Sequence, residues 1–581
     1  MIGVAPEGGT RAAFLEYIGR IRSGAVRPVT VFNTWYDMQG DELTESNSRE
    51  RMATLQSKLL DPYQIPLDSF VLDDGWDDYR IPWVVHARRF SGDFSSLSGW
   101  LQGRGTELGL WFGPFGGYGE GARLRVEAGR KQGWEVTANG LSLCLAGRNY
   151  HQKLKQVVLE MVRKYHVNHF KFDGVPYGCN DPNHGHLIGI YSREADLRAF
   201  LDILKSIRAA DSKAFLNITT GNWLSPWWLM YADVVFMGGL DYGFLNDVPA
   251  ASERDKAITY RDKILYDDFR RYEFQFPHNS LMTIGIIKGK LGGEGGLEES
   301  LETWINNAII NFSRGSMMTE LYLSPGILKP EEWRTLGEIM RWARANSDVL
   351  LGEARFIGGD PGERQVYGYS HFKEGRGIVT LRNPVIEAQS FVLPIETRGE
   401  HVYHARVIFP YSEPLPGTFR YGDSVPLELE GFETKVIEFS SAAGAAAAPA
   451  TPVRSPSIGG LRIDEHQGSF DLMIPEGSPA RLAILCEAAG ALTPELRRDG
   501  QPLQFQVVSP HSSEEGLGVG SGAWEFLVAA VPAGRSHIEF QLSGAAKVSA
   551  WIRRDREIGE PVIPAPIGKQ RHVTHLFSKQ W

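Results

Sequence analysis

The chain has 581 residues, too many for one hydrophobic core, and this length predicts roughly two to four domains. The composition, 42% hydrophobic and 23% charged, is that of a folded globular protein. The formal net charge of -9 disfavours nucleic-acid and anionic-membrane partners, because both attract clustered Lys and Arg. No apolar run reaches membrane-spanning length, and Met1 to Gly9 lack a signal pattern. We therefore expect a soluble protein, cytoplasmic or with its signal already removed.

In the first 350 residues, strand patterns alternate with helical patterns. A helix at 12–21 comes first, and strands are then predicted at 29–33, 68–76, 108–114, 168–173, 214–219, 234–239, 281–285 and 316–321. Helices are predicted at 46–60, 97–104, 122–132, 150–165, 193–209, 255–270, 297–311 and 330–346, with a short segment at 226–231. Eight strand-then-helix units in this length predict an α/β fold, a (β/α)8 TIM barrel.

After the barrel the pattern changes to short alternating strands separated by Gly, Pro and Asn turns. We predict a catalytic (β/α)8 barrel over 1–350 and an antiparallel β-domain over 351–440. An Ala/Pro/Ser linker is predicted over 441–460, and a β-sandwich-like domain with its tail over 461–581.

The predicted strand ends are rich in acidic and aromatic residues. In a TIM barrel, polar residues at these ends face the catalytic mouth. Carboxylates accept hydrogen bonds from sugar hydroxyls, and flat aromatic rings suit the apolar face of a sugar. The pattern therefore predicts a carbohydrate site, whose candidate residues are Trp35, Asp37, Asp73, Asp74, Trp76, Trp111, Lys171, Asp173, Asn217 and Asp241.

Lys171 and Asp173 point to the same face of their strand, because side chains alternate along a strand. A structural ion pair is the simplest interpretation of such a spacing taken alone. Glycoside hydrolysis needs two carboxylates flanking the bond, and Asp173 and Asp241 follow the fourth and sixth strands. We predict that Lys171 keeps Asp173 ionised, as a nucleophile requires. Asp241 is the candidate for the second carboxylate, and a loop-capping aspartate is the alternative interpretation.

Three motifs occur in an order that resembles a known family. They are Asp73-Asp74-Gly75-Trp76, Gly109-Leu110-Trp111-Phe112 and Lys171-Phe172-Asp173-Gly174. Together they resemble the α-galactosidase clan of glycoside hydrolases, families 27 and 36, and family 36 is the more similar.

The resemblance implies a retaining double displacement with Asp173 as nucleophile. It also implies that Asp73 and Asp74 hold the outer sugar hydroxyls, and that Lys171 and Trp111 bind the substrate. We add Trp35, Trp76, Asn217 and Thr219 as candidate substrate-binding residues, from their places at the strand ends.

The chain departs from the family pattern in three places. Asn217 to Trp223 replaces the C-x-x-G-G-x-R stretch of family 36, which leaves the identity of the sugar open. Asp241 matches the family's acid/base residue only with a one-residue gap, and Asp233 precedes its strand. The large N-terminal β-domain of family 36 has no counterpart, which predicts a divergent member or a shortened chain.

We predict a retaining exo-α-glycosidase acting on α-galactosides or α-N-acetylgalactosaminides. A transglycosylase similar to the raffinose synthases and a non-catalytic carbohydrate-binding protein are the alternatives. The expected partner is a carbohydrate, either an oligosaccharide or a glycoconjugate. We expect neither a nucleic-acid nor a membrane partner, and the sequence leaves open whether the chain forms a homo-oligomer.

We predict no cofactor and no metal. The spacing of Cys179, Asp181, His184 and His186 matches no usual set of metal ligands, so a hydrogen-bonded loop is the favoured interpretation. Glu320, on the eighth strand, is as compatible with packing as with a place in the pocket.

Overall fold

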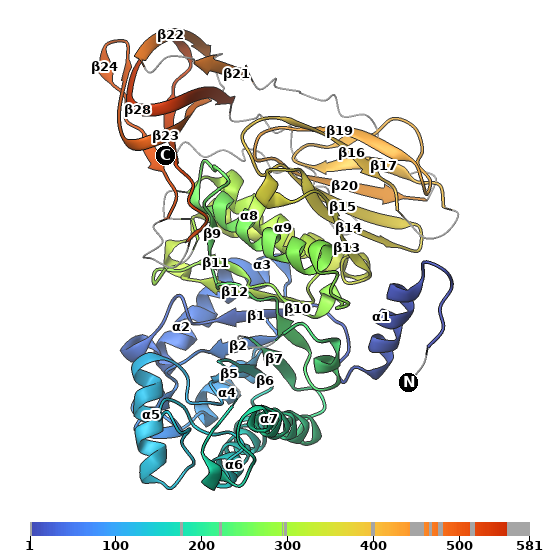
Figure 1. The fold of residues 1–581 in the computed structure, drawn as a ribbon, viewed down its shortest axis with the longest axis vertical. Helices are drawn as coiled ribbons and strands as arrows, with labels where there is room; N and C mark the ends of the chain where they lie inside the picture. Colours follow the sequence, from blue (N-terminus) through green and yellow to red (C-terminus); the bar gives the residue numbers. More distant parts are fainter. Residues whose placement is uncertain are drawn as a thin grey trace. The chain divides into compact units, whose positions relative to one another are not determined.

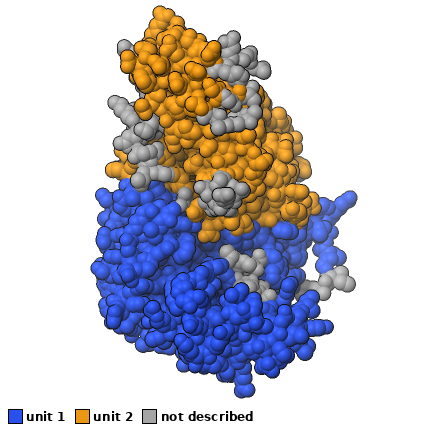
Figure 2. Space-filling view, turned by 60° about the vertical axis from the view of Figure 1, so that its left-hand side comes forward, with its two compact units in different colours: residues 1–238, 274–293, 316–328 blue, residues 239–273, 294–315, 329–581 orange. Residues whose placement is uncertain are grey.

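The computed structural model describes residues 3–174, 178–219, 223–292, 294–295, 299–396, 401–441, 458–463, 467–474, 480–511 and 518–554. Contacts divide the chain into two compact units (Figure 2). Unit 1 comprises residues 1–238, 274–293 and 316–328, and unit 2 comprises 239–273, 294–315 and 329–581. Among the helices of the described residues, none is long and apolar enough to cross a membrane.

A nine-stranded parallel sheet forms the centre of unit 1. Its order is β10-β8-β7-β6-β5-β2-β1-β12-β11. The strands are β1 (Val29–Asn33), β2 (Ser69–Leu72), β5 (Glu107–Phe112), β6 (His169–Phe172), β7 (Phe215–Ile218), β8 (Val234–Phe236), β10 (Leu281–Met282), β11 (Ile286–Lys288) and β12 (Met318–Leu323). Most of their side chains are buried, as is typical of parallel strands, and the buried residues include polar ones such as Lys171 and Glu320.

The helices of unit 1 follow the predicted pattern closely. They are α1 (Thr10–Ile21), α2 (Glu45–Leu55), α3 (Asp61–Tyr63), α4 (Ser95–Gln102), α5 (Gly119–Lys131), α6 (Arg148–Tyr165) and α7 (Ile190–Ala210), and α5, α6 and α7 lie outside the strands in Figure 1. In α6, Leu154, Val158 and Met161 recur every three or four residues and are buried. The helix ends where His166 adopts the left-handed conformation (φ 53°).

The predicted seventh strand, 281–285, is interrupted. Its first two residues form β10, and the chain resumes as β11 after Thr283, Ile284 and Gly285. Ile284 has a φ of 48°, and a Cβ on Gly285 would lie 1.5 Å from the backbone oxygen of Glu320. Only glycine fits this close approach, so the backbone bends here instead of continuing as one strand.

A hairpin that the sequence analysis did not predict follows β2. It pairs β3 (Asp77–Asp78) with β4 (Ile81–Val85). Trp83 within it has a φ of 66° and donates its backbone N–H to Asp77 Oδ2 at 3.0 Å. The hairpin therefore buries both Trp83 and Asp77.

The described part of unit 2 combines four α-helices with antiparallel sheets. The helices are α8 (Glu253–Tyr266), α9 (Leu301–Ser313), α10 (Pro330–Ala345) and the short α11 (Ser347–Leu350). A six-stranded sheet has the order β13-β14-β15-β20-β17-β18, from β13 (Ala354–Gly358), β14 (Tyr367–Lys373), β15 (Arg376–Arg382), β17 (His404–Phe409), β18 (Glu413–Pro414) and β20 (Thr434–Ser440). Strands β16 (Gln389–Pro394) and β19 (Ser424–Leu429) pair separately.

A buried carboxylate joins the helices of unit 2 to this sheet. Asp262 of α8 forms an ion pair with Arg314 at 2.8 Å and accepts hydrogen bonds from Tyr367 and Tyr369, both at 2.7 Å. Burial, the largest cause, and the negative charge of Asp262 raise the pKa of both tyrosines. This buried network fixes α8 against β14.

The last sheet of unit 2 has the order β21-β28-β23-β27-β25, with two further strands at its sides. Its strands are β21 (Ile458–Ile463), β22 (Gln467–Ile474), β23 (Ala480–Arg498), β24 (Gln501–Pro502), β25 (Gln506–Val508), β27 (Trp524–Val531) and β28 (Gly534–Arg554). A short pair joins β9 (Phe244–Leu245) to β26 (Gly518–Val519).

The expected class is confirmed in its coarser form, a TIM-like parallel sheet with helices followed by antiparallel sheets. The predicted domain boundaries remain a prediction. Most of the predicted linker, 441–460, and all of the tail after 554 lie outside the described residues.

Candidate active site

The predicted site residues of unit 1 gather at the carboxyl ends of its parallel strands. Register pairs Trp111 of β5 with Lys171 of β6, and Lys171 with Asn217 of β7. The ladder continues past the strand ends, because Asp173 N–H donates to Phe112 O at 2.8 Å and Thr219 N–H to Phe172 O at 2.9 Å. Adjacent strands therefore present these side chains at one edge of the sheet, where TIM-like enzymes place their catalytic groups.

Side chains of three described residues hold the Asp173 carboxylate. Trp111 donates its indole N–H to Oδ2 at 3.0 Å, whereas the Tyr118 and Thr219 hydroxyls donate to Oδ1 at 3.1 and 2.5 Å. Hydrogen bonds to the charged form favour an ionised carboxylate. The next residue, Gly174, has a φ of 69°, and a Cβ there would lie 2.9 Å from the Tyr118 hydroxyl, so glycine allows Tyr118 to approach.

Lys171 forms its ion pair with Asp73. Lys171 Nζ lies 2.7 Å from Asp73 Oδ2 and 3.2 Å from the Tyr322 hydroxyl, and all three side chains are buried. Burial alone would lower the pKa of Lys171, but the charges of Asp73, Glu320 and Asp173 raise it above its ordinary value. Lys171 is therefore a permanent cation whose charge also acts on Asp173.

Asn33 links Asp73 to a second buried carboxylate. Its Nδ2 donates to Asp73 Oδ2 at 2.9 Å and to Glu320 Oε1 at 2.8 Å. Burial raises the pKa of Glu320 to about 7, although the nearby charge of Lys171 opposes this. Asn33 therefore bridges the carboxylates of Asp73 and Glu320, and the charge of Lys171 acts on both.

Asp74 is held by an arginine from α5. Arg125 lies 2.6 Å from Asp74 Oδ1, and it bonds both carboxylate oxygens of Asp77 at 2.6 and 3.0 Å. Burial raises the pKa of Asp74 to about 6, against the opposing effect of Arg125. Asp74 belongs to a buried cluster of two acids and one base, next to Asp73 in the chain.

The tryptophans of the predicted site differ in burial. Trp76 is fully buried, donates its indole N–H to the Trp111 backbone oxygen at 2.7 Å, and packs against Phe112 at 5.2 Å between ring centroids. Trp35, two residues after β1, is half-buried, and its backbone N–H donates to Asn33 Oδ1 at 2.9 Å. Trp76 therefore supports the strand that carries Trp111, while Trp35 keeps part of its ring accessible.

Asn217 has an unusual environment. Its side chain is fully buried, and neither amide atom has a hydrogen-bond partner among the described residues. A buried amide without a partner costs about 1–3 kcal/mol, and native proteins rarely leave one in place. Asn217 of β7 lies beside Lys171 of β6 in the sheet, so its amide is suited to bind a polar ligand group.

Asp241 belongs to unit 2. It follows Gly238 and Gly239, whose φ values are 94° and 78°, and its half-buried side chain lies on the loop after β8. Its backbone oxygen accepts a hydrogen bond from Arg261, which also pairs with Glu294 at 3.1 Å. Arg261 therefore holds the loop through the backbone of Asp241. The pairing of the Asp241 and Asp173 carboxylates remains a prediction.

Sequence reasoning missed Asn33, Tyr118, Arg125 and Tyr322 as members of this network. The sequence signal is clearest for Arg125, which lies on the buried face of the amphipathic helix α5. A buried arginine needs an acidic partner, so its position indicates an ion pair. Cys144 was also missed, and it joins Cys179, His184 and His186 in a group of metal-binding side chains.

No model of a protein family matches this sequence, and no curated protein is similar to it in sequence. Solved structures are similar in fold. The α-galactosidase from Lactobacillus brevis has a TM-score of 0.55 at 14% identity and covers 74% of this chain and 57% of its own. AgaA, from Geobacillus stearothermophilus, has a TM-score of 0.53 at 13% identity, covering 73% and 57%. AgaB from the same organism has a TM-score of 0.53 at 14% identity, covering 73% and 57%.

The fold resembles that of the GH36 α-galactosidases. This confirms the predicted resemblance at the level of the fold, over about 70% of the chain. The chain matches a little over half the length of these GH36 enzymes, so their activity and substrates do not carry over with the fold. Variants of AgaA were solved in complex with raffinose and with stachyose.

Proposed function

We propose that this GH36-like chain is a retaining exo-α-glycosidase. It acts on terminal α-galactosides or α-N-acetylgalactosaminides through a covalent glycosyl-aspartate. One observation carries the proposal: the Asp173 carboxylate at the end of β6 accepts hydrogen bonds from the side chains of three described residues, beside the buried Lys171–Asp73 pair. An ordinary structural ion pair would need neither the three donors nor a second buried carboxylate, Glu320.

The proposed architecture is a closed (β/α)8 barrel followed by an antiparallel β-domain and a β-sandwich. Strands β10 and β11 are the two ends of the parallel sheet, yet they belong to one segment of chain, 281–288. Counting that segment once gives eight strand segments whose first and last neighbours meet, which supports a barrel.

In the proposed reaction, an Asp173 oxygen attacks the anomeric carbon and the bond to the leaving group breaks. Asp241 donates a proton to the departing oxygen and then takes a proton from water, which attacks the same carbon and releases Asp173. The charge of Lys171 and the donors Trp111 and Thr219 favour the ionised Asp173 that attack requires.

Asp73 and Asp74 are proposed to bind the outer hydroxyls of the sugar, together with Lys171. The buried amide of Asn217, next to Lys171 on the neighbouring strand, is proposed to bind a polar group of the sugar, because neither amide atom has a hydrogen-bond partner among the described residues. Trp35, which is half-buried, supplies apolar surface, whereas the buried Trp111 acts through its hydrogen bond to Asp173 and Trp76 supports Trp111. The complexes of AgaA variants with raffinose and stachyose favour a carbohydrate ligand for the related fold.

The test replaces Asp173 by Asn. We expect turnover of an aryl α-galactoside or aryl α-N-acetylgalactosaminide to fall by more than about a thousandfold, with an unchanged circular dichroism spectrum. Asp241→Ala should slow substrates with poor leaving groups far more than activated ones, and azide should restore turnover of the activated ones with an α-glycosyl azide as the product. A variant Asp173→Asn that keeps most of its rate would refute the nucleophile assignment.

The same experiments separate the two alternatives. A transglycosylase would give oligosaccharide products when an acceptor sugar is added, and its hydrolysis would be slow. A binding protein would retain the sugar in calorimetry without turnover, and neither Asp variant would change a rate.

A further inference from the structure

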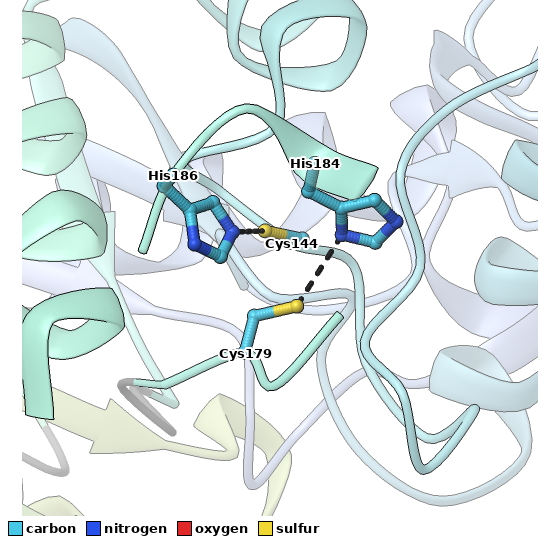
Figure 3. A group of neighbouring side chains, drawn as sticks. All are labelled: Cys144, Cys179, His184 and His186. Atoms are coloured by element: carbon cyan, nitrogen blue, oxygen red, sulfur yellow. Dashed lines mark hydrogen bonds between the residues drawn. The ribbon is translucent and has the colours of Figure 1, made fainter. Parts of the chain in front are cut away.

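Four side chains of unit 1 converge near the segment that follows Asp173. Cys144 comes from the segment between α5 and α6, whereas Cys179, His184 and His186 lie between β6 and α7. Their ligand atoms all lie within 4.8 Å of one another, and Figure 3 shows the side chains directed toward a common centre. Both cysteines are buried, and both histidines are half-buried.

The distances agree with a tetrahedral metal site. Cys144 Sγ lies 3.2 Å from His186 Nε2, and Cys179 Sγ lies 3.3 Å from His184 Nδ1. Zinc bonds of about 2.3 Å to sulfur and 2.0–2.1 Å to nitrogen place tetrahedral S and N ligands about 3.5 Å apart. Small inward or outward shifts of the side chains would therefore accommodate the ion.

The two histidines have the outer contacts that metal-bound histidines usually have. His186 Nδ1 lies 3.0 Å from the Leu187 backbone oxygen, and His184 Nε2 lies 3.5 Å from Asp181 Oδ2. An oxygen acceptor on one ring nitrogen keeps the proton there and leaves the lone pair of the other nitrogen for the metal. In each ring, the nitrogen left in this way is the one that faces a cysteine.

A buried carboxylate of α7 fixes both segments that carry the ligands. Asp196 accepts the N–H of Ala146 through Oδ1 and the N–H of Gly178 through Oδ2, both at 2.9 Å. Ser192 accepts the N–H of Cys179 at 2.9 Å. The two cysteines are therefore positioned by hydrogen bonds that do not depend on the metal, which is typical of a preformed site.

We propose that Cys144, Cys179, His184 and His186 bind one Zn²⁺ ion. Two thiolates neutralise the charge of the ion, and two sulfur and two imidazole ligands select zinc over magnesium or calcium. The four protein ligands complete the tetrahedron, so the ion is structural. It fastens the segment before α6 to the segment that begins six residues after Asp173.

Two hydrogen-bonded Cys–His pairs are the competing interpretation, and they would explain each short distance separately. They do not require that all four atoms converge, nor that both rings direct their second nitrogen to oxygen. A disulfide between Cys144 and Cys179 is a third interpretation; in the structure both are free thiols.

The test is the metal content of the full chain, purified without an affinity tag that binds metals. We expect about one zinc per chain by mass spectrometry, release of that zinc when a mercurial reagent modifies the cysteines, and a lower melting temperature afterwards. Replacement by Co²⁺ should give the visible bands of tetrahedral cobalt and a thiolate charge-transfer band. This readout does not depend on the proposed glycosidase activity.

Cys179→Ser and His186→Ala should lose the zinc, whereas the matched control Cys486→Ala should keep it. Cys486 is also a buried free thiol, but it lies on β23 of unit 2. If the variants fail to fold, the mercurial release and the cobalt spectrum of the unmodified chain still decide the question. A chain that binds neither zinc nor cobalt, or that contains a Cys144–Cys179 disulfide, would overturn the proposal.

Discussion

Arg125 offers the sharpest test of how the proposed sugar site is built. Its side chain is fully buried, with hydrogen bonds of 2.6 and 3.0 Å to Asp77, 2.6 Å to Asp74 and 3.0 Å to the backbone oxygen of Gly116. The change Arg125→Met keeps the length of the stem but removes the charge. It leaves the Asp77 and Asp74 carboxylates buried, only 0% and 11% exposed, without their cation.

Removing one partner of a buried ion pair costs about 3–5 kcal/mol, because the other charge stays desolvated. We expect this loss in the free energy of unfolding at pH 8. The pKa of Asp74, already raised to about 6, should rise further in the variant. A folded-state pKa above the unfolded value destabilises increasingly as pH rises, so the deficit should be largest at pH 8 and smaller at pH 5.

Urea unfolding followed by tryptophan fluorescence at both pH values measures the loss. Hydrogen exchange of peptides from β5 reports unit 1 separately. The control is Arg123→Met on the same helix, whose ion pairs with Glu120 and Glu127 are exposed and should not matter measurably. Equal stability of Arg125→Met and the unmodified chain at pH 8, or a loss that does not change with pH, would refute the reasoning.

Two further predictions concern the same site. Above pH 7, Glu320→Gln should increase the free energy of unfolding by about 3 kcal/mol, because burial raises the pKa of Glu320 to about 7 and its ionised form destabilises the fold. The unmodified chain should lose this stability as pH rises from about 4.5 to 7, whereas the variant should not, and melting temperatures across that range decide the matter. Thr219→Val should lower the kcat of the proposed glycosidase by roughly 10–150-fold with little change in KM, because the hydrogen bond to Asp173 contributes about 1.5–3 kcal/mol. Thr219→Ser keeps the hydroxyl and should keep the rate, and equal kcat values in Val and Ser variants would contradict the role.

The sequence by itself determined most of the helices and strands. Strand β1 was predicted with its observed bounds, and β2, β5, β6 and β7 within a few residues, because each is a short stretch of mainly apolar or alternating residues that ends at polar or glycine residues. The same strand ends located Asp73, Trp111, Lys171 and Asp173 at one rim. Periodicity is a local property, so one chain is enough to read it.

Only the tertiary structure decided which charges meet. Lys171 is two residues from Asp173 but pairs with Asp73, which comes from another strand, and Asp74 meets Arg125 from α5. Cys144 joins His186 across 42 residues, which no local spacing could reveal. Ion pairs and metal ligands depend on a few ångströms between distant segments, and those distances are fixed by the packing of the whole sheet and its helices.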